Sequence, residues 1–108
     1  MDYEEKFRTV ISEMEKAGFE YADAKALSWH LQEMRKVIIS NQMKSAPGKS
    51  MAEKELIART SQEYLTHLEG TKVAISNELR AKAKYEKLSA SYEALRSLSS
   101  QETARMKI

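Results

Sequence analysis

The sequence predicts an all-α protein: a long antiparallel helical hairpin, similar to a coiled coil, that assembles into an oligomeric helical bundle. Three observations predict this fold. The 108 residues contain one proline and three glycines, and two long stretches repeat apolar residues at helical spacing. A turn followed by a helix-capping sequence separates the two stretches. With 42% hydrophobic and 31% charged residues, the chain is too apolar to be disordered.

The first arm is predicted to be a helix over residues 2–44. Its apolar residues recur in steps of three and four, with one doubled step of three near Ala24. This stripe consists of Tyr3, Phe7, Val10, Met14, Ala17, Tyr21, Ala24, Leu27, Leu31, Met34 and Ile38. Because the doubled step departs from a heptad, we expect a locally irregular seam. At Gly18 we expect a kink or a close helix contact rather than a break.

Residues 45–50 form the predicted turn. Pro47 disfavours helical geometry at the residue before it, and Gly48 supplies a permissive turn position. Ser50 and Glu53 then match a capping box, in which the hydroxyl accepts from the Glu53 amide and the carboxylate reaches back to the Ser50 amide.

The second arm is predicted to be one helix over about residues 51–102, with a flexible point, and so a second place for a kink, at Gly70. Its stripe consists of Ile57, Ser61, Tyr64, Leu68, Lys72, Ile75 and Leu79, then Tyr85, Leu88, Tyr92, Leu95 and Leu98. Two arms of this length cannot cover their stripes with each other alone. We therefore expect one helical domain over residues 1–108 that forms a homodimer or a larger bundle.

Composition excludes several classes of function. Without cysteine the chain has no disulfides, thiolate metal sites or cysteine nucleophiles. Its start is acidic where a signal peptide would be basic, and no run approaches the roughly 20 apolar residues of a membrane span. We expect a cytoplasmic protein that has no membrane partner.

No residue pattern indicates an enzyme, a metal site or a cofactor. Gly48, Lys49 and Ser50 resemble the end of a phosphate-binding loop, but Met43 stands where that loop needs its first glycine. Lys49 at a helix start could still hold a single phosphate or sulfate. We favour the alternative of a turn plus a cap. His30 and His67 could be neighbours across the hairpin and share zinc or a proton, but we favour ordinary surface or interfacial histidines.

Two groups of residues are candidates for partner contacts. Arg80, Lys84 and Lys87 follow steps of four and three, so they share a helix face that could contact the phosphates of single-stranded DNA. This fits the charge distribution, because residues 1–70 carry a net −2 and residues 71–108 a net +4. Solvated lysines are the alternative. Trp29 could anchor a protein interface or flank the core, and Tyr85 and Tyr92 are further interface candidates.

The last third of the chain resembles a family of small helical bacteriophage and prophage proteins encoded in the early region. The resemblance rests on the segments that begin at Ala83 (AKYEKL), Tyr92 (YEALRS) and Glu102 (ETARMKI), with Tyr64, Gly70 and Ala74 at fitting spacing. It implies a protein of the bacterial host cytoplasm that works beside single-strand annealing and single-strand binding proteins, and it brings no catalytic residues.

Three functions remain open at this point. The first is a non-enzymatic, oligomeric accessory of phage DNA replication or recombination that binds an unidentified protein, single-stranded DNA or both. The second is a small inhibitor or adaptor that docks on a host enzyme, for example a defence nuclease. The third is a purely structural coiled-coil element.

Overall fold

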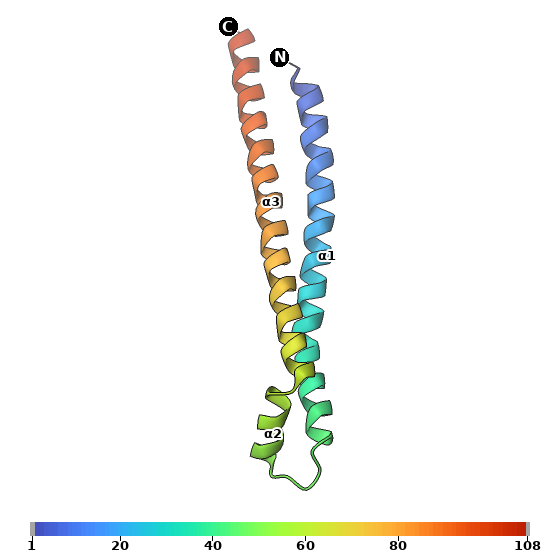
Figure 1. The fold of residues 1–108 in the computed structure, drawn as a ribbon. Coiled ribbons are helices and arrows are strands. Elements are labelled where there is room, and N and C mark those ends of the chain that lie inside the picture. Colours follow the sequence, from blue (N-terminus) through green and yellow to red (C-terminus); the bar gives the residue numbers. More distant parts are fainter. Residues whose placement is uncertain (1, 108) are drawn as a thin grey trace. The chain divides into compact units, whose positions relative to one another are not determined.

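The computed structural model describes residues 2–107, and it confirms the all-α helical hairpin (Figure 1). Helix α1 spans Tyr3–Lys44, α2 spans Met51–Arg59 and α3 spans Gln62–Met106. Residues 2–107 contain no strand. By contacts the chain divides into two units, one of Met1–Asp23 with Leu79–Ile108 and one of Ala24–Glu78. The single domain expected over the whole chain therefore stays a prediction.

Within the first unit, α1 and α3 run antiparallel and contact each other through aromatic side chains. Phe7 meets Tyr92 edge-on with ring centroids 5.7 Å apart, and Tyr21 meets Tyr85 at 6.4 Å. The partner's number falls as the α1 number rises, which defines the antiparallel direction. Aromatic pairs in such tilted arrangements add to the burial of apolar area.

Helix α1 does not break at Gly18, as expected, and the space beside Tyr85 of α3 would admit a Cβ. A Cβ at this position would lie 3.5 Å from Cε2 of Tyr85. Further out in the same unit, a hydrogen bond from Tyr3 to the Glu102 carboxylate raises the pKa of the tyrosine above 10.0. Pairing therefore reaches from the first turn of α1 to the last turns of α3.

The hairpin turn is built as its residues predict. Helix α1 ends at Lys44, and Gly48 takes a φ of 80°, a left-handed conformation that costs glycine little. Ser50 caps α2 by accepting a hydrogen bond from the Glu53 amide at 3.2 Å. The Glu53 carboxylate accepts from the Ser50 hydroxyl at 3.0 Å. Of the two hydrogen bonds in the predicted capping box, only the one from the Glu53 amide to the Ser50 hydroxyl is therefore present. The Glu53 carboxylate contacts the Ser50 hydroxyl instead of the Ser50 amide.

The prediction of one continuous second helix is wrong. Helix α2 ends at Arg59 and α3 begins at Gln62, because two adjacent hydroxyl residues compete with the helix for backbone groups. Thr60 Oγ1 donates to the carbonyl of Leu56 at 2.8 Å, while Ser61 Oγ donates to the Ala58 carbonyl at 2.7 Å. The same Ser61 Oγ accepts from the Tyr64 amide at 3.2 Å. Helix α3 then continues through Gly70 to Met106, past the predicted end near residue 102.

The seam of α1 has one irregular step, at a different position from the one that its apolar residues predict. The buried or half-buried residues of this seam follow steps of four and three, at Tyr3, Phe7, Val10, Met14, Ala17, Tyr21, Ala24, Ser28, Leu31, Met34 and Ile38. The doubled step of three moves from Ala24 to Leu31, because Ser28, which is 0% exposed, takes the place expected of Leu27, which is 53% exposed. Gln32 Nε2 donates to Ser28 Oγ at 3.0 Å, so the buried hydroxyl is satisfied. The locally irregular seam expected from the sequence is thus present, but further along α1 than predicted.

The seam of α3 is also shifted in its first half. The positions that turn inward there are Tyr64, His67, Thr71, Ala74 and Glu78. The expected members Leu68 and Ile75 are each one residue away and are 45% and 37% exposed. A one-residue step turns a helical side chain by about 100°. Small and polar residues therefore fill this part of the seam, and large aliphatic residues flank it.

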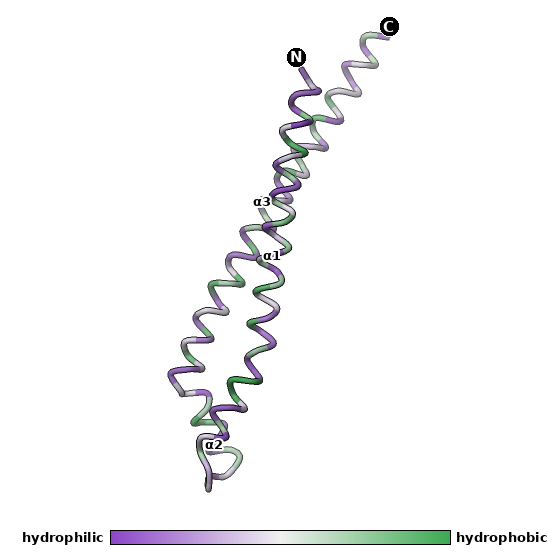
Figure 2. The backbone as a smooth tube through the Cα atoms, turned by 90° about the vertical axis from the view of Figure 1, so that its right-hand side faces the viewer, coloured by the Kyte–Doolittle hydropathy of each residue, from purple (hydrophilic) through white to green (hydrophobic). Residues whose placement is uncertain are grey.

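Neither long helix resembles a membrane span. Figure 2 shows hydrophilic and hydrophobic segments alternating along α1 and α3. Among residues 2–107, no helix combines the length and the apolar composition that crossing a membrane requires.

Replacing Gly70 with alanine should raise the free energy of unfolding by about 0.5–1 kcal/mol, because alanine is the better helix former. The added Cβ meets no atom within 4 Å. Urea denaturation followed by circular dichroism at one fixed protein concentration measures the change.

Gly48→Ala is the matched control and should lower the free energy of unfolding, because the φ of 80° at this position is strained for alanine. A loss of stability in Gly70→Ala would contradict an uninterrupted helix at that position.

Candidate interaction surfaces

The interior that the described residues form is made mainly of small side chains. The buried residues are Ala17, Ser28, Ala46, Ala58, Tyr64 and Ala74. Leucine, isoleucine and valine, which usually dominate a core, are absent from this group. The chain exposes 8217 Å², about 2,000 Å² more than the roughly 6,100 Å² expected of a folded monomer of 12.4 kDa. Large apolar side chains such as Phe19, Leu56 and Val73 are 66%, 66% and 58% exposed, so apolar surface is left for contacts with something else.

One such surface lies along α3 in the second unit. Leu65, Leu68 and Ile75 are 44%, 45% and 37% exposed and form what we call the aliphatic flank. Leu68 and Ile75 are seven residues apart, so they lie two turns apart on one side of the helix. Both line a hollow of about 410 Å³ that Gln32, Glu33 and Arg35 of α1 also border. The flank therefore sits beside the groove between the two arms of its unit.

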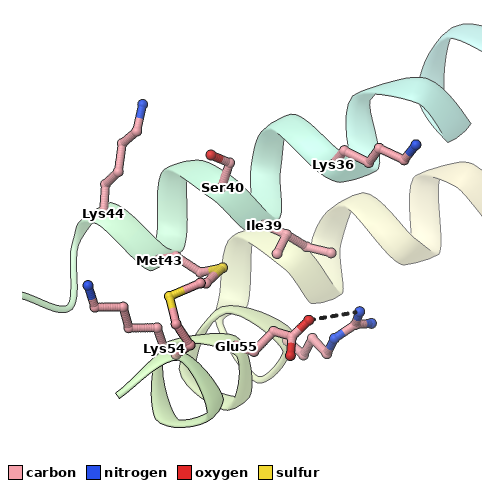
Figure 3. A pocket seen from close by; sticks show the side chains of 9 residues that line it. Lys36, Ile39, Ser40, Met43, Lys44, Lys54 and Glu55 are labelled. Carbon is pink, nitrogen blue, oxygen red and sulfur yellow. Dashed lines mark ion pairs between the residues drawn. The ribbon is translucent and has the colours of Figure 1, made fainter. Parts of the chain in front are cut away.

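A second surface is an open groove at the hairpin corner, which we call the corner groove. It has a volume of about 520 Å³ and lies between the end of α1 and α2. Its apolar part is Ile39 and Met43 from α1 with Met51 from α2. Figure 3 shows the Met43 side chain in the space between α1 and α2.

Basic side chains border the corner groove. Lys36 and Lys44 come from α1, and Lys54 and Arg59 come from α2. The one carboxylate there, of Glu55, pairs with Arg59 at 3.7 Å (Figure 3). The sequence alone does not single out these cations, because they are dispersed along the chain. The signal was available, since a turn at Pro47 folds the residues before it against those after it.

The predicted DNA-contact residues share an exposed face of α3, as their spacing predicts. Arg80, Lys84 and Lys87 are all exposed. Lys84 Nζ, however, forms an ion pair of 3.2 Å with Glu20. Lys84 and Lys87 also border a hollow that contains Glu13. Carboxylates of α1 therefore reduce the positive potential of this face.

The three candidate interface residues have different environments. Trp29 is 64% exposed. Tyr85 and Tyr92 are half-buried, and their rings contact Tyr21 and Phe7 of the same chain. Trp29 is thus the candidate with most of its surface available to a partner.

The remaining candidates gain no binding partner from the structure. Lys49 is exposed on the turn, next to a helix start that already carries the Glu53 carboxylate. His67 is half-buried and lies 3.3 Å from Thr71 Oγ1 through its Nε2, whereas His30 is exposed. Within residues 2–107, no group of three or more potential ligands could hold a metal ion.

Comparison with known proteins gives no relative from which to transfer a function. No protein-family model, no curated protein and no solved structure matches the chain.

Replacing Trp29 with alanine should change the free energy of unfolding by less than about 0.5 kcal/mol, because its side chain makes few contacts within the chain. Tyr64→Ala is the contrasting control and should cost about 3 kcal/mol, since Tyr64 is only 7% exposed. Urea denaturation compares the two variants. A cost above about 2 kcal/mol for Trp29→Ala would identify the residue as part of the core instead.

Proposed function

We propose that the chain is a non-enzymatic helical interaction module that associates with a second copy through the aliphatic flank. Leu68 and Ile75 carry the proposal, because they lie one residue outside the seam and remain 45% and 37% exposed. Isolated exposed leucines are common on protein surfaces. Leu68 and Ile75 instead share one side of α3 beside a seam of small and polar residues, and such an arrangement favours a partner.

The thin interior supports this proposal on energetic grounds. Burying apolar surface stabilises by about 25 cal/mol per Å², and the buried residues of this chain are mostly alanine and serine. A second copy of the chain can cover the flank without a different partner protein. In a two-fold symmetric pair the same patch lies on both sides of the interface, and aliphatic side chains suit such an interface because they complement themselves.

Replacing apolar residues of the flank with acidic ones tests self-association. Leu68→Glu with Ile75→Glu should weaken assembly at least about 100-fold, because each chain then loses two side chains whose burial contributes about 1.5 kcal/mol or more apiece. Sedimentation equilibrium over a range of protein concentrations measures the dissociation constant.

Val73→Glu is the matched control, because Val73 is 58% exposed on the same helix but lies two residues from Ile75 and so faces another direction. It should leave assembly unchanged. A wild-type chain that stays monomeric at every concentration would refute the proposal. If Val73→Glu weakened assembly equally, the interface would lie on another face of the helix.

A role in phage DNA replication or recombination is the second candidate, favoured by the exposed face of Arg80, Lys84 and Lys87. Fluorescence anisotropy with labelled oligo-thymidine tests it. Replacing all three with glutamine should reduce the slope of log affinity against log salt by about 2, since each phosphate contact to a single strand contributes about 0.7. Lys6→Gln with Lys25→Gln and Lys107→Gln, the remote-lysine variant, should bind like wild type. No binding at low salt would exclude direct DNA contact.

An adaptor that docks on a host enzyme is the alternative that exposed Trp29 favours. Trp is enriched where binding energy concentrates. Recovery of one stoichiometric host enzyme by the wild-type chain, and its loss with Trp29→Ala, would select this alternative over a role in recombination.

A further inference from the structure

The corner groove has the dimensions and the lining of a binding site rather than of a packing defect. Its volume of about 520 Å³ lies within the roughly 300–1,000 Å³ that ligand sites occupy. Met51 is 69% exposed at its edge, opposite Ile39 and Met43. Methionine is unbranched and flexible, so two methionines let the groove adapt to apolar side chains of different shape.

Charge is more concentrated around the groove than anywhere else considered above. Four cations border it against one carboxylate, which gives a formal +3, whereas the whole chain carries +2. The single carboxylate, of Glu55, is already paired with Arg59. Lys36, Lys44 and Lys54 form no ion pair within residues 2–107. An occupant must therefore bring negative charge.

The combination of apolar floor and basic edge selects the class of occupant. Single-stranded nucleic acid binds through aromatic side chains that stack on its bases, and no aromatic residue lines this groove. A bilayer takes up apolar side chains that project from a protein, whereas Ile39 and Met43 lie inside a concavity. A projecting apolar side chain on an acidic protein segment satisfies both features.

We infer that the corner groove docks an acidic amphipathic helix of a partner protein. Its apolar face, with residues spaced three and four apart, enters between Met43 and Met51. Glutamates and aspartates on its borders pair with Lys36, Lys44 and Lys54. These exposed pairs govern the rate of association and specificity more than affinity, and the apolar contact supplies most of the affinity. The inference is independent of self-association through the aliphatic flank.

Fluorescence anisotropy with designed probe peptides tests the inference on the full-length chain. The probe is a labelled helical peptide of about 18 residues, long enough to be helical, with leucines on one face and glutamates elsewhere. It should bind, and more weakly as salt rises. A peptide with lysine in place of glutamate should not bind, and one with serine in place of leucine should bind at least about tenfold more weakly.

Variants locate the probe on the groove. Lys36→Gln with Lys44→Gln and Lys54→Gln should weaken binding at least about tenfold and flatten its salt dependence. The remote-lysine variant changes the net charge equally and should bind like wild type. Met51→Gln should weaken binding at least about threefold. Because Met51 is so exposed, this variant keeps the fold, which circular dichroism verifies.

Four results would overturn the inference. They are equal binding by the acidic and basic peptides, unchanged binding by the triple glutamine variant, and preferential binding of oligo-thymidine or phosphatidylglycerol vesicles at the groove. The fourth is loss of self-association in the triple variant, which would make a second copy the occupant. Flank variants that fail to associate but still bind the acidic peptide would leave the inference standing.

Discussion

The antiparallel seam between α1 and α3 is the constraint on which the other features depend. In the first unit its aromatic pairs, Phe7 with Tyr92 and Tyr21 with Tyr85, set the register of the arms. In the second unit Ser28 and Ala74 occupy seam positions. Small residues there let two helices approach closely, but they bury little apolar area. The large aliphatic residues beside them are consequently left outside, and they define the surfaces that the chain presents.

Much of the fold was predictable because local chemistry decides it. The end of α1 at Lys44, the left-handed Gly48 and the cap at Ser50 follow from residue types over a few positions. The break between α2 and α3 was missed because Ser61 fits a helical stripe as well as a cap. The adjacent pair of Thr60 and Ser61, followed by Gln62 and Glu63, was the local signal for it.

The candidate surfaces were less predictable, because they depend on which of two neighbouring residues turns inward. A search for apolar periodicity prefers Leu27 to Ser28, and Leu68 to His67, since hydrophobicity is all that it counts. The structure places the polar residue inside in both cases. Steric fit against the opposite helix decides these positions, and that information lies on the other arm of the hairpin. The corner groove was likewise hidden, since its cations meet only after the chain turns.

The order of contacts along the hairpin has a consequence for how the chain acquires its structure. Ile39 and Met43 reach Met51 across a single short turn, whereas Tyr3 reaches Glu102 only when nearly the whole chain has been brought back on itself. Closing a loop costs more entropy as the loop lengthens. Folding should therefore nucleate at the corner and extend outward, each new heptad layer shortening the loop that the next must close. A destabilising substitution near Pro47 would lower the folding rate. A destabilising substitution near the termini would chiefly raise the rate of local unfolding.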